Sequence, residues 1–178
     1  MTEESLERRL RAAIRTIPDF PKPGIQFKDI TPVLADPPLF RDTLDALAER
    51  ARALGAEKVI GVDARGFLFA APVAERLEVG LIPVRKPGKL PYQTLSEEYA
   101  LEYGTNALEM HTDAIEPGEK VVVVDDLLAT GGTVRAAARL IEAVGGVMAG
   151  AVFVIELGFL DGRSRLAGYE CSSLVDFE

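Results

Sequence analysis

The sequence predicts an α/β fold in which a mainly parallel sheet is covered by helices on both faces. Short apolar runs rich in β-branched residues occupy residues 59–62, 80–84, 121–124 and 149–157. Helical spacing follows two of these runs, over residues 67–77 and 133–145. Strands that are apolar throughout and alternate with helices are typical of parallel sheets buried on both faces. The order of these elements indicates a doubly wound arrangement.

The composition is that of an ordinary globular protein, with 178 residues, 48% of them hydrophobic and 27% charged. A chain of this length can bury a conventional core. Because no repeat or linker divides it, we expect residues 1–178 to form a single domain. The net charge of −8 argues against a nucleic-acid-binding protein, which gains affinity from Lys and Arg. A small phosphate pocket stays possible, since a few cations and backbone N–H groups suffice to form one.

The sequence predicts neither a secretory signal nor a transmembrane segment. The N-terminal residues alternate charged and apolar side chains, unlike a secretory signal, and no run of about 18 apolar residues predicts a transmembrane helix. Cys171 is the only cysteine, which fits a reducing compartment. We therefore expect a cytoplasmic protein without a membrane partner, and we assign no catalytic role to Cys171 or to His111, the sole histidine.

Two helices are expected before the first apolar run. Leu6, Leu10 and Ile14 recur at helical spacing and predict a helix over about residues 3–16. The three prolines that follow predict an extended segment, and a second helix is predicted over residues 38–54. The apolar stripe of the first helix could pack on its own core or on a neighbouring subunit, and the sequence does not decide between them.

Residues 85–117 interrupt the alternation of strands and helices. They are rich in Gly, Pro and charge, with short alternating pieces, so we expect a long excursion that contains a small hairpin. Loops this long within compact domains usually serve function.

The clearest functional signal is VVVVDDLLATGGT, residues 121–133. The strand delivers Asp125 and Asp126 to the carboxyl edge of the sheet, where doubly wound folds bind ligands. The turn into the next helix then consists of Ala129, Thr130, Gly131, Gly132 and Thr133. Glycines let backbone N–H groups converge, and a helix N-terminus adds partial positive charge, so this turn suits a terminal phosphate.

The two acids indicate a sugar beside that phosphate. Carboxylates would repel the anion but accept hydrogen bonds from hydroxyl groups, so the combination predicts a ribose 5-phosphate site. The turn is not a Walker A loop, because no Lys-Ser or Lys-Thr follows the glycines. The alternative is that Asp125 and Asp126 only cap the helix after the strand.

This string resembles the phosphoribosyl diphosphate signature of the type I phosphoribosyltransferases. Further segments resemble the adenine phosphoribosyltransferases over nearly the whole chain: VDARGFLFAAPVA (residues 62–74), RKPGKLP (85–91), YALEYG (99–104) and PDFPKPGIQFKDITP (18–32). The resemblance implies a parallel sheet flanked by helices and a flexible active-site loop. It also implies a small hood from the first 35 or so residues and residues near 158–170. The implied reaction converts adenine and 5-phospho-α-D-ribose 1-diphosphate to AMP and diphosphate, a step of purine salvage.

The resemblance also assigns roles to residues around the sugar phosphate. Asp125 and Asp126 would hold the ribose hydroxyls, with Asp126 and Arg65 among the catalytic residues. The 5-phosphate would bind the turn formed by Ala129, Thr130, Gly131, Gly132 and Thr133. Diphosphate would bind the turn containing Arg65, often through a non-proline cis peptide, and the cations Arg85, Lys86 and Lys89. The family often has a further basic residue where this chain has Pro87. A surface ion pair for Arg65 and a solvated loop for Lys86 are the structural alternatives.

Further roles concern the base and the loop that covers it. Glu102 would handle the proton of the purine and Tyr103 would close the loop, although an ordinary hairpin would also explain both. Adenine would lie between Phe27 and Leu160 and be read by the backbone near Gln26 and Lys28, unless Phe27 is plain core. Mg²⁺ would travel with the diphosphate and need no direct protein ligand. The family is commonly homodimeric.

Two other functions would fit a sugar-phosphate pocket. A phosphoribosyltransferase for guanine, hypoxanthine or xanthine often uses a lysine beyond the phosphate turn, and AVFVIELGFLDGR (residues 151–163) contains none. A non-catalytic regulator that kept the sugar-phosphate pocket would carry a basic surface or an added DNA-binding domain, for which this chain has neither the charge nor the length.

Overall fold

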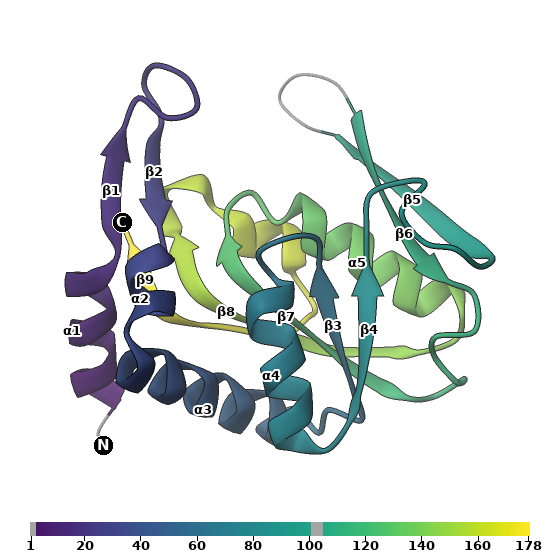
Figure 1. Cartoon of the computed structure of the whole chain (residues 1–178). Helices are drawn as coiled ribbons and strands as arrows, with labels where there is room; N and C mark the ends of the chain where they lie inside the picture. Colours follow the sequence, from purple (N-terminus) through teal and green to yellow (C-terminus); the bar gives the residue numbers. More distant parts are fainter. Residues whose placement is uncertain (1–2, 101–104) are drawn as a thin grey trace.

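A five-stranded, wholly parallel sheet forms the centre of the computed structural model, which describes residues 3–100 and 105–178 (Figure 1). In spatial order its strands are β4 (Gly80–Val84), β3 (Lys58–Val62), β7 (Lys120–Leu128), β8 (Val147–Leu157) and β9 (Cys171–Phe177). The predicted α/β class with a mainly parallel sheet is confirmed.

Helices cover both faces of this sheet. The helices of one face are α1 (Glu3–Ala13), α2 (Thr31–Ala35), α3 (Pro37–Ala53) and α4 (Phe67–Leu77). Helix α5 (Gly132–Ala143) covers the other face. Side chains of β7 alternate between the two cores, because Val122 and Val124 face α3 and α4 while Val121 and Val123 face α5. A strand buried on both faces explains the unbroken valine run in the sequence.

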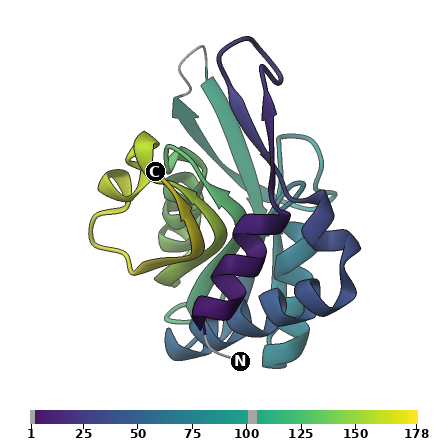
Figure 2. The same ribbon diagram turned by 90° about the vertical axis from the view of Figure 1, so that its left-hand side faces the viewer.

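Two hairpins project beyond the carboxyl edge of the sheet (Figures 1 and 2). One pairs β1 (Arg15–Pro18) with β2 (Gln26–Asp29), and the other pairs β5 (Thr94–Ala100) with β6 (Thr105–His111). Between β8 and β9 the chain forms two short 3-10 helices, η1 (Gly158–Leu160) and η2 (Gly162–Leu166). These three segments surround the edge at which the parallel strands end.

The N-terminal apolar stripe packs on the chain's own core. Leu6, Leu10 and Ile14 are at most 6% exposed, and they belong to the same core as α3. The helix ends at Ala13 rather than near Thr16, because Arg15 begins β1. The structure therefore resolves the alternative that the sequence left open.

Strand β9 and the hairpin β1–β2 were not predicted. The segment of β9, CSSLVDF, mixes polar and apolar residues because it is the edge of the sheet, with Leu174 and Val175 buried and Asp176 exposed. Elsewhere the expected helix at residues 67–77 and strand at residues 80–84 match α4 and β4. None of the described helices combines the length and the apolar character needed to cross a membrane.

Candidate active site

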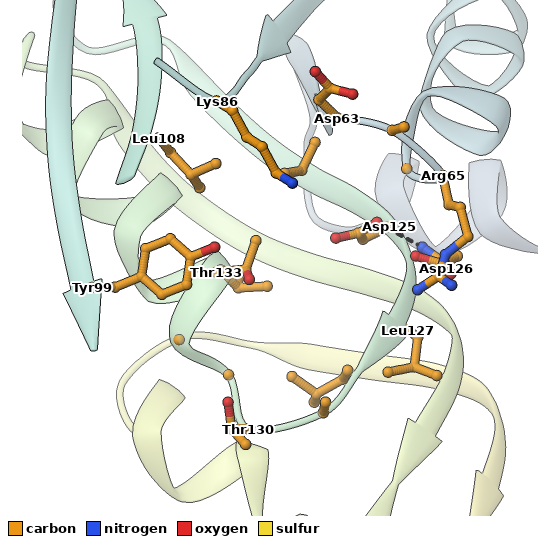
Figure 3. Close-up of a pocket in the computed structure, with 18 residues that line it drawn as sticks. Asp63, Arg65, Lys86, Tyr99, Leu108, Asp125, Asp126, Leu127, Thr130 and Thr133 are labelled. Carbon is orange, nitrogen blue, oxygen red and sulfur yellow. Dashed lines mark hydrogen bonds and ion pairs between the residues drawn. The ribbon is translucent and has the colours of Figure 1, made fainter. Parts of the chain in front are cut away.

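A cavity of about 430 Å³ opens at the carboxyl edge of the sheet (Figure 3). Its walls come from the end of β7 with the turn into α5, from the loop after β3, and from Lys86 after β4. Tyr99 and Leu108 of the β5–β6 hairpin close the side opposite Asp125 and Asp126. Segments far apart in the sequence thus converge on one pocket, as is usual at this edge of a doubly wound sheet.

Two buried acids stand side by side in this pocket. Asp125 is 8% exposed and Asp126 6%, and the backbone N–H of Asp126 donates to Oδ1 of Asp125 over 2.9 Å. Oδ2 of Asp126 lies 2.7 Å from Nε of Arg65. Burial raises the pKa of the Asp125 carboxyl well above its usual value, and the adjacent Asp126 carboxylate raises it further. Perturbed buried acids in a cleft are typical of functional sites.

The turn after β7 lies below these acids. Gly131 adopts a left-handed conformation, with φ of 79°, and serves as the N-cap of α5. This conformation brings the first turn of the helix to the pocket, and all five predicted residues line it: Ala129, Thr130, Gly131, Gly132 and Thr133. The N-terminus of an α-helix presents unpaired N–H groups and partial positive charge, so the turn can bind an anion.

The loop after β3 supplies a second polar wall. The Asp63–Ala64 peptide bond is cis, as the resemblance implied for this turn. Arg65 lines the pocket, as expected, and points toward Asp126 (Figure 3). It also forms an ion pair with Asp126, so the alternative that the sequence offered for Arg65, an ion pair, is present as well. Asp63 accepts a hydrogen bond of 3.0 Å from Nε of Arg85.

The predicted cations differ in their placement. Lys86 lines the pocket and extends over it (Figure 3). Arg85 is not among the lining residues, because its guanidinium is bound to Asp63 and to the carbonyl of Lys89. Lys89 is exposed and also lies outside the pocket wall.

The predicted base-binding residues lie beside this pocket rather than in it. Phe27 and Lys28 line a neighbouring apolar cavity of about 190 Å³ together with Arg65, whose guanidinium carbon is 5.3 Å from the Phe27 ring centroid. Gln26 is exposed, and Leu160 in η1 is 39% exposed. The structure thus brings Phe27 and Lys28 to Arg65, while Gln26 and Leu160 line neither cavity.

Two expected residues, Glu102 and Tyr103, lie outside the described part of the chain. Sequence reasoning missed two lining residues on the hairpin that flanks them, Tyr99 and Leu108. The alternating pattern of residues 105–111 could have suggested which side chains face inward, but not that they reach this pocket.

Comparisons with known proteins agree on one family. The sequence profile of the phosphoribosyl transferase domain matches residues 33–170. An adenine phosphoribosyltransferase of Desulfitobacterium hafniense is 58% identical over 164 residues, which cover 92% of this chain and 95% of that protein.

Solved structures agree with the sequence relatives. The crystal structure of adenine phosphoribosyltransferase from Thermoanaerobacter pseudethanolicus superimposes with a TM-score of 0.93 at 53% identity, covering 99% of this chain and all of that one. The enzyme of Saccharomyces cerevisiae, crystallised with an imino-altritol bisphosphate and adenine, gives a TM-score of 0.90 at 38% identity, covering 96% of this chain and 99% of that one.

Proposed function

The chain belongs to the adenine phosphoribosyltransferases of the phosphoribosyltransferase family, and from that premise we propose which of its residues perform the transfer. The enzyme joins adenine to the phosphoribosyl group of 5-phospho-α-D-ribose 1-diphosphate and releases AMP and diphosphate, a reaction of purine salvage. A 6-oxopurine substrate and a non-catalytic regulator are not favoured by these relatives.

One observation carries the assignment of the sugar phosphate: a single cavity is lined both by the acids Asp125 and Asp126 and by the turn from Ala129 to Thr133. The turn provides backbone N–H groups and the hydroxyls of Thr130 and Thr133 for the 5-phosphate. The two carboxyl groups accept hydrogen bonds from the ribose hydroxyls. The phosphate and the hydroxyl groups of one sugar phosphate would therefore both have hydrogen-bonding partners in this cavity.

The leaving diphosphate lies, in this proposal, on the Arg65 and Lys86 side of the pocket. When the bond between the anomeric carbon and the diphosphate oxygen breaks, its electron pair passes to the diphosphate. Preorganised cations aimed at that developing charge lower the barrier. Arg85 acts through Asp63, which it holds at 3.0 Å, and Lys89 reaches the diphosphate only by a movement of its loop.

The purine nitrogen forms the new bond to the anomeric carbon and then loses a proton. We assign this proton to Glu102 and the closing of the loop to Tyr103. Adenine stacks on Phe27 with Leu160 opposite, and the backbone near Gln26 and Lys28 reads its amino group. An aromatic face beside an apolar cavity supports this arrangement, since flat bases stack well on such surfaces. The hood would then comprise the first 35 or so residues and those near 158–170, within one domain of residues 1–178.

Mg²⁺ is proposed to enter with the diphosphate. This ion keeps several waters and takes one or two carboxylates plus phosphate oxygens. We propose no direct protein ligand for it, and within the described residues no group of three or more His, Cys, Asp or Glu is arranged as a metal cage. When bound, the ion neutralises charge on the departing diphosphate.

The transfer is tested by incubating the protein with adenine, Mg²⁺ and phosphoribosyl diphosphate and measuring AMP by chromatography. Parallel reactions with hypoxanthine and guanine are the matched controls. We expect AMP at a rate that exceeds the 6-oxopurine reactions by at least about 10²-fold, because a base with reversed donors and acceptors leaves polar groups of the site unpaired. Comparable rates with hypoxanthine would contradict the assignment.

We also propose a homodimer in the cytoplasm. The apolar side chain of Leu81, in the edge strand β4, is 40% exposed and would form part of the subunit contact. Sedimentation equilibrium measures the mass of the particle independently of its shape, and a monomer at micromolar concentration would contradict the proposed homodimer. Fractionation of the source cells tests the cytoplasmic location.

A further inference from the structure

Three side chains form a compact network where β8, η2 and β9 meet. The guanidinium of Arg163 donates two parallel hydrogen bonds to Glu156, Nε to Oε1 and Nη2 to Oε2, each 2.6 Å long. The hydroxyl of Ser173 donates to the same carboxylate over 2.8 Å. Nη1 of Arg163 donates to the carbonyl of Cys171 over 2.7 Å. Arg163 thereby ties the 3-10 helix η2 to the ends of two strands.

The paired geometry makes this tie directional. A planar guanidinium that meets a carboxylate through two bonds fixes both distance and orientation, which a lysine ammonium does not. Glu156 is 6% exposed, and although burial raises the pKa of its carboxyl, the hydrogen bonds from Arg163 and Ser173 outweigh burial and lower it. The network therefore holds an ionised pair at neutral pH.

Gly162, the residue before Arg163, packs directly against the turn of Ala129 to Thr133. A Cβ added to Gly162 would collide with the carbonyl oxygen of Ala129, and a Cβ added to Gly131 would lie 2.6 Å from the carbonyl oxygen of Gly162. Backbone thus meets backbone with no side chain between them. Any displacement of Gly162 is transmitted directly to the turn, because there is no flexible group to absorb it.

We propose that Arg163 is a positioning residue for the 5-phosphate of the sugar substrate, acting through Gly162 on the turn of Ala129 to Thr133. Arg163 does not line the pocket and contacts no substrate there. Its bonds to Glu156 and Cys171 fix η2, η2 supports the turn from behind, and the turn keeps its N–H groups directed at the phosphate. This inference rests on the proposed function, because it names what the turn binds.

The test compares Arg163→Gln with Arg163→Lys and Glu156→Gln. We expect Arg163→Gln to raise KM for phosphoribosyl diphosphate on the order of tenfold, with a smaller change in kcat. The coupling free energy between residues in contact is typically large enough to produce a factor of this size. Arg163→Lys keeps the charge but not the paired bonds, so we expect its KM for phosphoribosyl diphosphate to lie between those of the wild type and Arg163→Gln. Combining Glu156→Gln with Arg163→Gln should add little to either single change, because both break the same tie.

Arg76→Gln is the matched control. Arg76 forms an ion pair of 2.7 Å with Asp45, between α4 and α3, and lines none of the cavities described above. Losing it should leave KM for both substrates unchanged. A merely structural role for Arg163 would lower Tm in the same way as this control and leave KM for phosphoribosyl diphosphate at the wild-type value, and that result overturns the inference.

Calorimetric titration with ribose 5-phosphate separates this inference from the proposed function. Weaker binding by Arg163→Gln and Glu156→Gln, with unchanged binding by Arg76→Gln, supports the positioning role even without turnover. Wild-type protein that binds ribose 5-phosphate but makes no AMP contradicts the proposed function alone. Equal affinity for ribose 5-phosphate in the wild type and in all three Gln variants contradicts the inference alone. If Arg163→Gln does not fold, Arg163→Lys and Glu156→Gln decide the result.

Discussion

The carboxyl ends of the neighbouring strands β7 and β8 bury acids in opposite electrostatic settings. At the end of β8, Glu156 receives two bonds from Arg163 and one from Ser173, and its pKa is lowered. At the end of β7, Asp125 accepts a bond from the backbone of Asp126, lies beside a second carboxylate, and its pKa is raised. Both ends belong to one parallel ladder, in which Asp125 pairs with Phe153 and Leu128 with Glu156.

The different surroundings of Glu156 and Asp125 distinguish an acid that stabilises the fold from an acid that can bind a ligand. An acid whose hydrogen-bonding capacity is filled by its own protein stabilises the fold, whereas one left beside a like charge in a pocket can accept hydrogen bonds from a ligand. The β7 end therefore fits the substrate, and the β8 end fits the support of the turn. Each of the following changes tests one side of this contrast.

The largest effect is expected from replacing both Asp125 and Asp126 with Asn. Two hydrogen bonds to charged acceptors are worth about 4 kcal/mol together, so kcat/KM for phosphoribosyl diphosphate should fall by roughly 10³-fold. Initial-rate measurements of AMP formation test this. Circular dichroism should show an unchanged fold, and normal turnover would refute the sugar-binding role.

Gly131→Ala should lower kcat/KM by about 10²-fold, because the new methyl group meets the carbonyl of Gly162 and displaces the turn. Gly118→Ala is the matched control, since Gly118 has a similar φ of 88° but nothing within 4 Å of an added Cβ. Both changes should cost about 1 kcal/mol of stability from the left-handed backbone alone. Equal activity of the two variants would show that the contact with Gly162 does not shape the site.

Glu156→Gln should lower the free energy of unfolding by about 2 kcal/mol at pH 7, less than for a fully buried pair because Arg163 is half exposed. The folded-state pKa of Glu156 is lowered, so its contribution is present above the ordinary value of 4.5 and is lost as the pH falls through the folded pKa. Urea titrations at several pH values should show the two proteins converging in acid. A difference that is independent of pH would contradict an ionised Glu156.

Asp125→Asn should change stability by less than Glu156→Gln does, and in the opposite direction. The folded-state pKa of Asp125 is raised, so the wild-type protein loses stability as the pH rises from about 3.8 through the folded pKa. The variant lacks this loss, and its Tm near pH 7.5 should be higher by about 2–4 °C, the shift expected for about 1 kcal/mol in a chain of this size. A lower Tm would mean that the ionised carboxyl is satisfied by the fold.

The sequence predicted the β7 end well and the β8 end hardly at all. The string from Val121 to Thr133 is continuous, so acids, glycines and helix start could be read together, and all of them line the pocket. The network of Glu156 joins residues 7 and 17 positions apart, across η2 and the unpredicted strand β9. Such a network depends on tertiary packing, and no local pattern reports it.

The same limit applies to the cations. Arg85, Lys86 and Lys89 look equivalent in the sequence, but only Lys86 lines the pocket, because the side chain of Arg85 turns to Asp63. Tyr99 is the opposite case, because it lines the pocket although the sequence did not predict it there. Its position depends on how the β5–β6 hairpin folds back over the sheet, which residue spacing does not determine.

The backbone contact between Gly131 and Gly162 has a bearing on inhibitor design. Since the loop after β8 abuts the phosphate turn without intervening side chains, the spacing between the phosphate subsite and that loop is set by the scaffold before any ligand arrives. A compound that joins a phosphate mimic to a purine mimic should therefore gain more from a stiff connector of the right length than from a flexible one, because the receptor offers little accommodation and a stiff compound loses less entropy on binding.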